Sequence, residues 1–485
     1  MRNIKLISHR VFQKKDRFFW WNMVSFIREI WRCNMISYEN ELFKTANKLR
    51  GKIPPSDYKF YVLPLVFIRY MSEKKNDSAW AGIVAKSGDE KISSILDAEL
   101  VKILPQFSNM TNPYEDIYTN SNLPVRTIKD LINLINDIDL KSSTGKIDYL
   151  GQIYEYFIGN FAATEGNRGG EFFTPPSVVN LLVNMLNPQE GLVYDPACGT
   201  GGMFIQSSKY GESNLKFLGQ EQNCKTILLA YMNGVLHGLD IEIKNGDTLL
   251  NDCFPDLKAD YVISNPPFNM KEWGAEQLDS EDPRIFGMVN KNNANYMWIQ
   301  HFIYHLKPNG KAGFVISNGA LTSSNEADLF TRKRMLEKNI IDCVVQLPDK
   351  MFIGTAIPSA LIFLDMDRNE DDKILFIDAS KFGENVSKTQ KVISEDNIER
   401  ISKLYRSFKE KKRVKYNVKG YSWVTDVKEV IKDGCKLMPS IYTGVEETII
   451  NQKENDAEIK LLKVKLSEQI KKSNSLANML LKGLS

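Results

Sequence analysis

Short β-rich runs alternate with helical stretches from Gly169 to about residue 380, and no other feature of this 485-residue chain restricts its fold more. Each run is nearly continuous in apolar residues. A strand that is apolar on both sides has to be buried on both faces, so the pattern predicts a parallel sheet covered by helices. Seven runs are expected to be strands: 192–194, 216–219, 241–243, 261–263, 312–316, 341–345 and 360–364. The last two are too close in sequence for a long helix between them, so the final strand is expected to run antiparallel.

The segments that flank this alternation have a different pattern. Residues 35–165 carry apolar positions at helical spacing, including a buried run from Tyr61 to Met71, and predict a helical amino-terminal domain. Residues 166–385 are expected to form the α/β domain, and residues 386–485 a helical carboxy-terminal region for contact with another subunit. Within that region, the amphipathic segment 454–482 fits packing either on a partner helix or on its own domain.

Charge is distributed unevenly along the chain. The net charge is +3, but residues 1–34 hold eight basic and two acidic residues, which leaves 55 basic against 58 acidic residues in the rest. A slightly acidic body does not by itself indicate a nucleic-acid-binding protein, so contact with DNA would need a local basic patch or a partner. The basic run 409–415 is either such a patch or an ordinary solvated face.

The sequence indicates a cytoplasmic protein without membrane association. No apolar run approaches the roughly 20 residues needed to cross a bilayer, and residues 1–34 lack the cleavage site of a secretory signal. Two interpretations of residues 1–34 remain open: an amphipathic helix on a membrane surface, or a non-native or disordered extension upstream of a start at Met35. We favour the second. The six cysteines lack the close spacing of a zinc site, so we predict reduced thiols and no metal.

A glycine-rich turn follows the first expected strand. Glycines allow a backbone to approach a ligand closely, and open α/β sheets bind ligands at the carboxyl ends of their strands. The spacings of dinucleotide-binding and phosphate-binding loops are absent, so a nucleoside without a diphosphate fits better. The candidate binding residues in this turn are Asp195, Ala197, Cys198, Gly199, Thr200 and Gly201.

Two acidic residues follow the next two expected strands. Glu221 is placed to accept hydrogen bonds from both hydroxyls of a ribose, although it could instead cap the helix that begins at Cys224. Asp247 is placed to accept a hydrogen bond from the amino group of a cofactor's adenine, although Asn-Gly-Asp is also an ordinary turn. The order of these residues after the glycine-rich turn favours the binding interpretation.

The loop Asn265-Pro266-Pro267-Phe268 after the strand at 261–263 carries the most specific signal. Its two prolines fix the loop and remove backbone donors. The side-chain oxygen of Asn265 and the carbonyl of Pro266 can then both accept hydrogen bonds from one amino group, while Phe268 stacks on a planar base. Holding both N–H groups favours a pyramidal nitrogen whose lone pair is available for attack. An ordinary Pro-Pro turn is the alternative, and it does not explain the order of the landmarks.

These residues resemble those of the N6-adenine DNA methyltransferases, which depend on S-adenosylmethionine. The segment Gly169–Val179 is similar to the cofactor-binding segment that precedes the first strand in the relevant class. An aromatic ring near a sulfonium cation is also physically favourable. The resemblance implies that the cofactor is further contacted by Glu171, Phe172, Phe173, Thr174, Pro175 and Pro176.

Two more segments, 41–70 and 352–360, resemble the modification subunits of type I restriction-modification systems. The resemblance implies a Rossmann-like methyltransferase sheet with a helical amino-terminal domain and a helical carboxy-terminal tail. It implies direct methyl transfer to N6 of an adenine flipped out of double-stranded DNA, and protection of host DNA from restriction. The implied partners are a specificity subunit, a second copy of the modification subunit and, in the full complex, a restriction subunit.

Other functions remain open at this point. Cytosine N4, protein glutamine or ribosomal RNA could supply the acceptor amine, since methyltransferases of these classes share the Asn-Pro-Pro-aromatic loop. The segment Gly169–Val179 and the helical domain favour DNA. A subunit that binds DNA and cofactor without turnover is the alternative from another class, and the intact loop Asn265–Phe268 argues against it.

Overall fold

The computed structural model describes residues 52, 57–104, 117–137, 174–211, 214–352, 357–369, 372–387, 390–445, 463 and 467. The chain divides into two compact units, Met1–Thr443 and Gly444–Ser485, and every element named below belongs to the first. Among the described residues, no helix combines the length and the apolar character that crossing a membrane requires.

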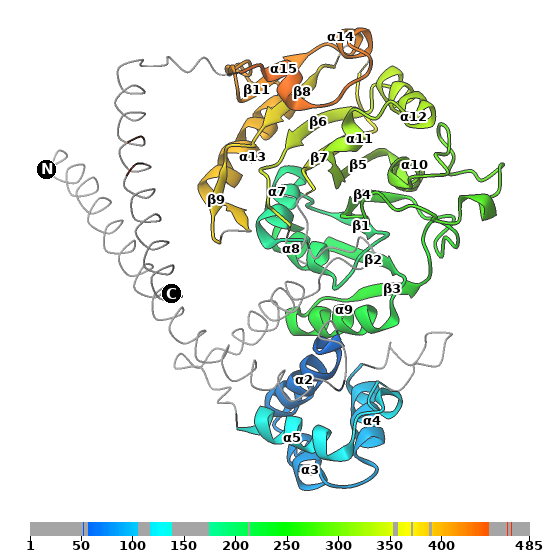
Figure 1. Ribbon diagram of the computed structural model, residues 1–485, viewed down its shortest axis with the longest axis vertical. Coiled ribbons are helices and arrows are strands. Elements are labelled where there is room, and N and C mark those ends of the chain that lie inside the picture. Colours follow the sequence, from blue (N-terminus) through cyan, green and yellow to red (C-terminus); the bar gives the residue numbers. More distant parts are fainter. Residues whose placement is uncertain are drawn as a thin grey trace, which may run out of the picture. The chain divides into compact units, whose positions relative to one another are not determined.

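A nine-stranded sheet forms the centre of the larger unit, in the order β11-β8-β6-β7-β5-β4-β1-β2-β3 (Figure 1). All seven predicted strands are present, as β1 to β7. The strands of this sheet are β1 (Gly191–Asp195), β2 (Leu215–Glu221), β3 (Ile241–Asn245), β4 (Ala259–Ser264), β5 (Leu306–Ser317), β6 (Ile341–Gln346), β7 (Ser359–Asp365), β8 (Ile374–Asp378) and β11 (Ser422–Thr425). A separate pair joins β9 (Gly383–Asn385) to β10 (Lys391–Ile393).

Parallel pairing determines where the strand ends lie. β1 pairs in parallel with β2 and β4, β2 with β3, and β4 with β5. The carboxyl ends of β1, β2, β3 and β4 therefore meet at one edge of the sheet. β7 runs antiparallel to both β5 and β6, which confirms the direction that the short β6–β7 connection predicted.

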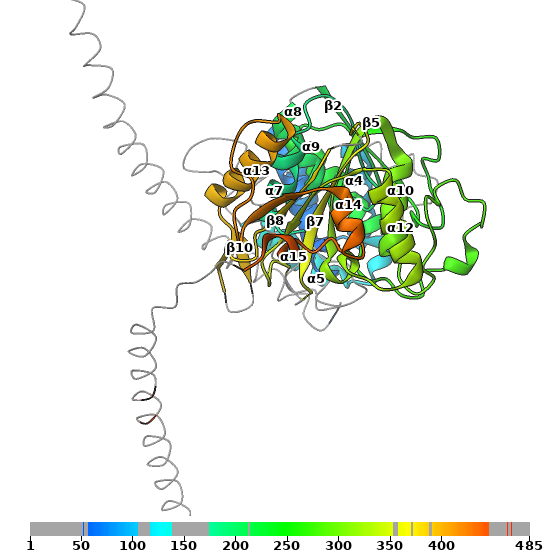
Figure 2. The ribbon, with the colours of Figure 1, turned by 90° about the horizontal axis from the view of Figure 1, so that it is seen from above.

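Helices cover both faces of the sheet, as the apolar strands predicted. In the view of Figure 2, α7, α8 and α13 lie on one side of the strands, and α10, α12 and α14 lie on the other. The helices around the sheet are α7 (Pro176–Leu186), α8 (Gly202–Gly211), α9 (Cys224–His237), α10 (Asn295–His305), α11 (Asn318–Leu321), α12 (Glu326–Glu337), α13 (Glu395–Lys409), α14 (Val427–Lys432) and α15 (Pro439–Thr443).

The two faces have separate hydrophobic cores. Neighbouring residues of one strand alternate between them: Val193 packs in the core that includes α7, α9 and α13, and Tyr194 packs in the core that includes α10 and α14. Both side chains are fully buried. This alternation follows from the two-residue period of a strand and fixes the sheet between its helical layers.

Four described α-helices precede α7: α2 (Lys59–Lys75), α3 (Ala79–Ala85), α4 (Ile92–Ile103) and α5 (Val125–Asn136). The predicted buried helix lies within α2 and includes Pro64. α2 packs against α9, with the Lys225 ammonium 5.8 Å from the centre of the Phe60 ring. The helical domain is thus in contact with the sheet domain.

The predicted boundary at residue 385 is wrong. β11 pairs antiparallel with β8, so the sheet extends to Thr425, and the region after residue 385 also contains β10. The four residues of β11 are too few to produce a recognisable alternation, and only their pairing with β8 makes them a strand. The predicted features at 1–34 and 150–161 lie outside the described residues, as does the tail 454–482 except at 463 and 467.

Candidate active site

A cavity of about 340 Å³ lies at the carboxyl edge of β1 to β4, which is large enough for a small-molecule ligand. It brings all four sequence landmarks together. The predicted residues in its wall are Thr174, Pro176, Asp195, Ala197, Cys198, Gly199, Thr200, Glu221, Asp247, Asn265, Pro266, Pro267 and Phe268. The predicted residues Glu171, Phe172 and Phe173 lie outside the described part of the chain.

Pro175 and Gly201 are outside the wall of the cavity and shape the backbone beside it. The carbonyl of Pro175 accepts hydrogen bonds from the backbone N–H groups of Val178 and Val179 and so begins α7. Gly201 has a φ of +78°, which glycine adopts without strain, and its carbonyl accepts the N–H of Phe204 in the first turn of α8.

Asp195 ends β1 and is 2% exposed. Its Oδ1 accepts hydrogen bonds from Ser264 Oγ at 2.7 Å and from the backbone N–H of Ala197 at 3.1 Å. Burial raises the pKa of Asp195 to about 7, even though these hydrogen bonds oppose the shift. A positive charge placed beside this carboxyl would favour its ionised form, so the site is suited to a cationic ligand.

Glu221 ends β2 and accepts two backbone hydrogen bonds. Its Oε2 accepts the N–H of Gly199 at 3.1 Å, and its Oε1 accepts the N–H of Asn223 at 2.8 Å. The cap of α9 is Asn223, whose side chain accepts from Lys225 and Thr226. Glu221 is therefore not the helix cap, and it lies in the cavity wall.

Asp247 follows β3 and both forms a turn and lines the cavity. Its Oδ1 accepts the backbone N–H groups of Leu249 at 3.0 Å and Leu250 at 3.4 Å. Asp247 is nevertheless one of the residues that line the cavity. The turn and the binding role are therefore compatible with each other.

Thr174 orients the amide of Asn265. The Nδ2 of Asn265 donates a hydrogen bond to Thr174 Oγ1 at 2.9 Å. In this contact the nitrogen end of the amide faces Thr174, and the acceptor oxygen is at the opposite end. The segment before α7 and the loop after β4 thus form one unit, although they are 91 positions apart in the chain.

Phe268 is held against a second aromatic ring. It is 5% exposed and packs edge-on against Phe352, with 5.6 Å between the ring centres. The next residue, Asn269, has a φ of +54°, and its backbone N–H and side-chain oxygen both bond to the side chain of Asn295 at 2.9 Å. The loop is therefore tethered to the first residue of α10.

Sequence reasoning missed several residues of the cavity wall. Val179 and Asn180 follow Pro176 at the spacing of one helix face, so the periodicity of α7 was a usable signal. Lys59 of α2 and Trp298 of α10 reach the cavity from distant elements. No local pattern identifies those two residues.

Comparison with known proteins agrees with this geometry. A family model described as N-6 DNA methylase matches residues 145–450, and one described as HsdM N-terminal domain matches residues 38–137. The chain is 31% identical to the type I restriction enzyme MjaIX methylase subunit of Methanocaldococcus jannaschii, with 91% of each chain covered. It is 33% identical to the HindI methylase subunit of Haemophilus influenzae, over 74% of this chain and 84% of that one.

The fold agrees as well. The crystal structure of a type I restriction-modification methyltransferase subunit from Streptococcus thermophilus matches with a TM-score of 0.69 at 24% identity, over 84% of this chain and 99% of the other. The predicted α/β methyltransferase fold is confirmed, and the enzyme class is that of S-adenosylmethionine-dependent, adenine-specific DNA methyltransferases. The chain belongs to the N-6 DNA methylase family, among the methylase subunits of type I restriction-modification systems.

Proposed function

We propose that this chain transfers a methyl group from S-adenosylmethionine to N6 of an adenine that is flipped out of double-stranded DNA. The observation that carries the proposal is one cavity shared by the carboxylates of Asp195, Glu221 and Asp247 and by the loop Asn265–Phe268. Carboxylates suit a cationic nucleoside cofactor, and the loop suits a neutral planar amine.

The cavity fits S-adenosylmethionine in size and in charge. Asp195 would face the positive charge of the methionine part, Glu221 the ribose hydroxyls and Asp247 the adenine amino group. Thr174 and Pro176 also line the cavity, and we propose Glu171, Phe172 and Phe173 as further contacts at the methionine end. The bound cofactor supplies an electrophilic methyl group on a sulfonium centre, which is its own leaving group.

Asn265 and Pro266 act on the acceptor amine. The side-chain oxygen of Asn265 and the carbonyl of Pro266 would accept its two N–H groups, which orients the nitrogen lone pair towards the methyl group. After transfer, the surplus proton passes from the amine to water. Burial raises the pKa of Cys198 well above its ordinary value, so the thiol in the cavity wall stays protonated and is not offered as a nucleophile.

Phe268 would stack on the target base. An adenine inside a duplex is out of reach of the cavity, so it has to be flipped out. The edge-on contact with Phe352 holds the Phe268 ring in one orientation. Stacking of a base on an aromatic ring contributes roughly 1–3 kcal/mol, which offsets part of the cost of unstacking.

We further propose that the chain works with a specificity subunit, a second modification subunit and, in the full complex, a restriction subunit, and that methylation protects host DNA. The basic run 409–415 does not offer a free patch for DNA, which supports the view that a partner supplies much of the contact with DNA. Lys409 pairs with Asp365 at 2.7 Å and Lys411 with Asp372 at 2.9 Å, and Lys412 pairs with Glu410. Since three of the five basic residues in the run are already paired, it fits a solvated face better than a phosphate-binding patch.

Nucleoside mass spectrometry tests the proposal. DNA would be taken from a methylation-deficient host that expresses this chain, its specificity subunit, or both. We expect N6-methyladenine only when both are present, and none when Asn265→Ala replaces the wild type. N4-methylcytosine in the DNA, or methyl label in protein or RNA with unmodified DNA, would contradict it.

A further inference from the structure

The segment between β3 and β4 forms a wall of the cavity and takes its shape from buried polar side chains. Asp247 and Thr248 line the cavity. Gln220 of β2 donates a hydrogen bond to the carbonyl of Asn251 at 2.7 Å and accepts the N–H of Cys253 at 3.1 Å. Side chains thus satisfy backbone groups that have no strand partner here.

Arg284 binds the same segment through two backbone carbonyls. Its Nη1 donates to Thr248 O and its Nη2 to Leu249 O, both at 2.8 Å. Arg284 is 5% exposed, and its Nε and Nη2 also donate to the carboxylate of Asp282, at 2.9 and 2.6 Å. A guanidinium held by a carboxylate and two carbonyls has little freedom to move.

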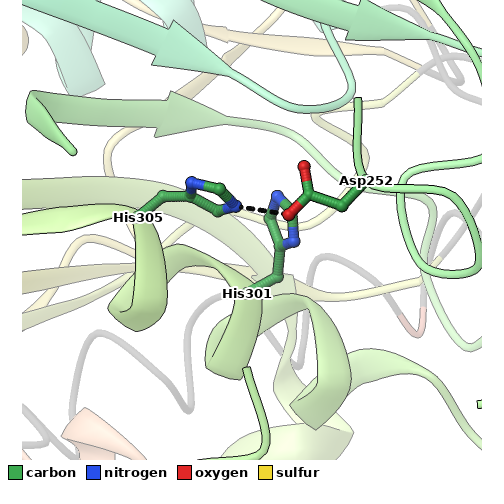
Figure 3. A group of neighbouring side chains, drawn as sticks. All are labelled: Asp252, His301 and His305. Carbon is green, nitrogen blue, oxygen red and sulfur yellow. Dashed lines mark hydrogen bonds and ion pairs between the residues drawn. The ribbon is translucent and has the colours of Figure 1, made fainter. Parts of the chain in front are cut away.

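Asp252 and two histidines of α10, His301 and His305, lie close together (Figure 3). Arg284 lies beside them, in contact with His301. The Nδ1 of His305 is 3.0 Å from the carbonyl of Leu257, and its Nε2 is 2.9 Å from Asp252 Oδ2. A carbonyl only accepts, so Nδ1 donates to it, and a proton must also lie between Nε2 and the carboxylate. Burial would raise the pKa of Asp252, but the hydrogen bond and charge of His305 outweigh it and lower that pKa. The contact is therefore a hydrogen bond between the imidazole and the carboxylate.

Asp252, His301 and His305 also have donor atoms within 4.8 Å of one another, as a metal centre requires. Arg284 argues against a metal ion there. Its Nη1 lies 3.4 Å from His301 Nδ1, so a divalent cation would lie next to a buried guanidinium. Tyr194 also contacts His301 Nε2, at 3.2 Å. Asp252, Arg284, His301 and His305 thus form one packed group, the buried cluster. In it Arg284 contacts His301, Asp252 contacts His305, and the centres of the two imidazole rings are 4.3 Å apart.

Arg284 is anchored by the elements that hold the catalytic loop. It comes from the segment that joins Phe268 to α10. At the two ends of that segment, Asn269 bonds to Asn295, and the N–H of Ala294 donates to the carbonyl of Met270 at 3.1 Å. The place of the guanidinium is therefore fixed relative to both the catalytic loop and the wall at Asp247.

We propose that Arg284 is a positioning residue for the cofactor, which holds Asp247 to Leu249 in the shape that receives the adenosine part. The proposal rests on the proposed function. Arg284 is not among the residues of the cavity wall, so it would act through Asp247 and Thr248. Its loss should weaken cofactor binding and leave the rate of methyl transfer at saturating cofactor nearly unchanged.

The test compares Arg284→Lys with Arg368→Lys in the full chain bound to its specificity subunit. Arg368 is a matched control, because its side chain is 3% exposed and paired with Asp342, but it does not line the cavity. Lysine keeps the charge and loses the planar fork. We expect the Kd of S-adenosylmethionine, measured by calorimetry, to rise about tenfold in Arg284→Lys and less than about twofold in Arg368→Lys. The value of kcat at saturating cofactor should stay within about threefold of wild type in both.

A second variant keeps the proposal testable if Arg284→Lys does not fold. Asp282→Asn combined with Arg284→Met removes the contacts to both carbonyls without leaving an unpaired buried charge, and it should raise the Kd similarly. An equal rise of Kd in the Arg368→Lys control, or a loss of kcat with unchanged Kd, would overturn the positioning role. Stoichiometric metal in the purified protein would overturn the conclusion that the buried cluster does not bind a metal ion. Failure of the wild type to bind the cofactor would instead contradict the proposed function itself.

Discussion

The two halves of the cavity are built from different chemical groups. At the ends of β1, β2 and β3 the wall carries the carboxylates of Asp195, Glu221 and Asp247, whereas at the end of β4 it carries an amide, proline rings and the aromatic ring of Phe268. The first half is suited to a cation and the second to a neutral base. Adjacent parallel strands end less than about 5 Å apart, so one sheet edge can hold two ligands of different charge side by side.

Asn265→Ala should have the largest effect, because it should lower methyl transfer strongly without changing cofactor binding. Loss of one preorganised hydrogen-bonding group at a reacting centre commonly lowers kcat by about 100- to 1000-fold, and we expect a loss of this size. The Kd of S-adenosylmethionine should stay within about twofold of wild type, since Asn265 belongs to the other half. Single-turnover transfer of labelled methyl and calorimetry measure the two quantities.

Asn339→Ala is the control for this variant, because Asn339 is also a buried asparagine, 8% exposed, and lies outside the cavity wall. It should lower stability without affecting transfer. If Asn265→Ala lost cofactor binding and turnover equally, Asn265 would be structural and the division into halves would fail.

Asp195 should make cofactor binding depend on pH. Its pKa of about 7 in the free protein would fall when a cation binds, so binding releases a proton below pH 7. Affinity should therefore rise with pH, by at most about tenfold per unit, and level off above about pH 7. The folded pKa is above the unfolded value, so the free protein should also lose stability as pH rises from about 4 to about 7.

Asp195→Asn checks this prediction. The variant should bind S-adenosylmethionine more weakly, with an affinity that no longer changes between pH 5.5 and 8.5. Without cofactor, the wild type should become less stable to heat as the pH rises from about 4 to about 7, and the variant should not. An unchanged pH slope of the Kd would assign the dependence to another group.

Phe268→Leu should moderately weaken the binding of DNA. Replacing the ring removes part of a stacking contact worth roughly 1–3 kcal/mol, so the KM for DNA should rise about fivefold. The Kd of the cofactor should not change. Phe376→Leu is the matched control, since Phe376 is a buried ring stacked on Tyr442 with 4.1 Å between centres, away from the cavity. A similar rise of the KM for DNA in Phe376→Leu would contradict the proposal that Phe268 stacks on the base.

Thr174→Val should have a small effect on methyl transfer, similar in size to that of Phe268→Leu on KM. It replaces the hydroxyl that orients Asn265 by a methyl group of similar size, so kcat should fall about three- to tenfold through the loss of one hydrogen bond. Thr174→Ser should restore most of the rate. If Thr174→Val weakened cofactor binding and left kcat unchanged, Thr174 would be limited to its predicted cofactor contact and would not orient Asn265.

The seven apolar runs predicted β1 to β7, because burial on both faces imposes a pattern that can be read locally. The same argument placed Asp195, Glu221 and Asn265 together, since parallel strands end at one edge. β11 and the wall residue Trp298 could not be predicted, because a short strand depends on its neighbour and a wall residue on distant packing. Arg284 lies in a polar stretch of sequence, and only the structure shows that its charge is buried.

The antiparallel hairpin of β6 and β7 has a consequence for how this enzyme family can vary. β6 ends and β7 begins at the carboxyl edge of the sheet, and Phe352, six residues after the end of β6, contacts the ring of Phe268. A hairpin turn can lengthen or shorten in evolution without changing the neighbours of any strand, whereas a parallel crossover must keep a helix that spans the sheet. The side of the site next to Phe268 is thus the part that insertions can remodel while the carboxylates at the ends of β1, β2 and β3 stay in place.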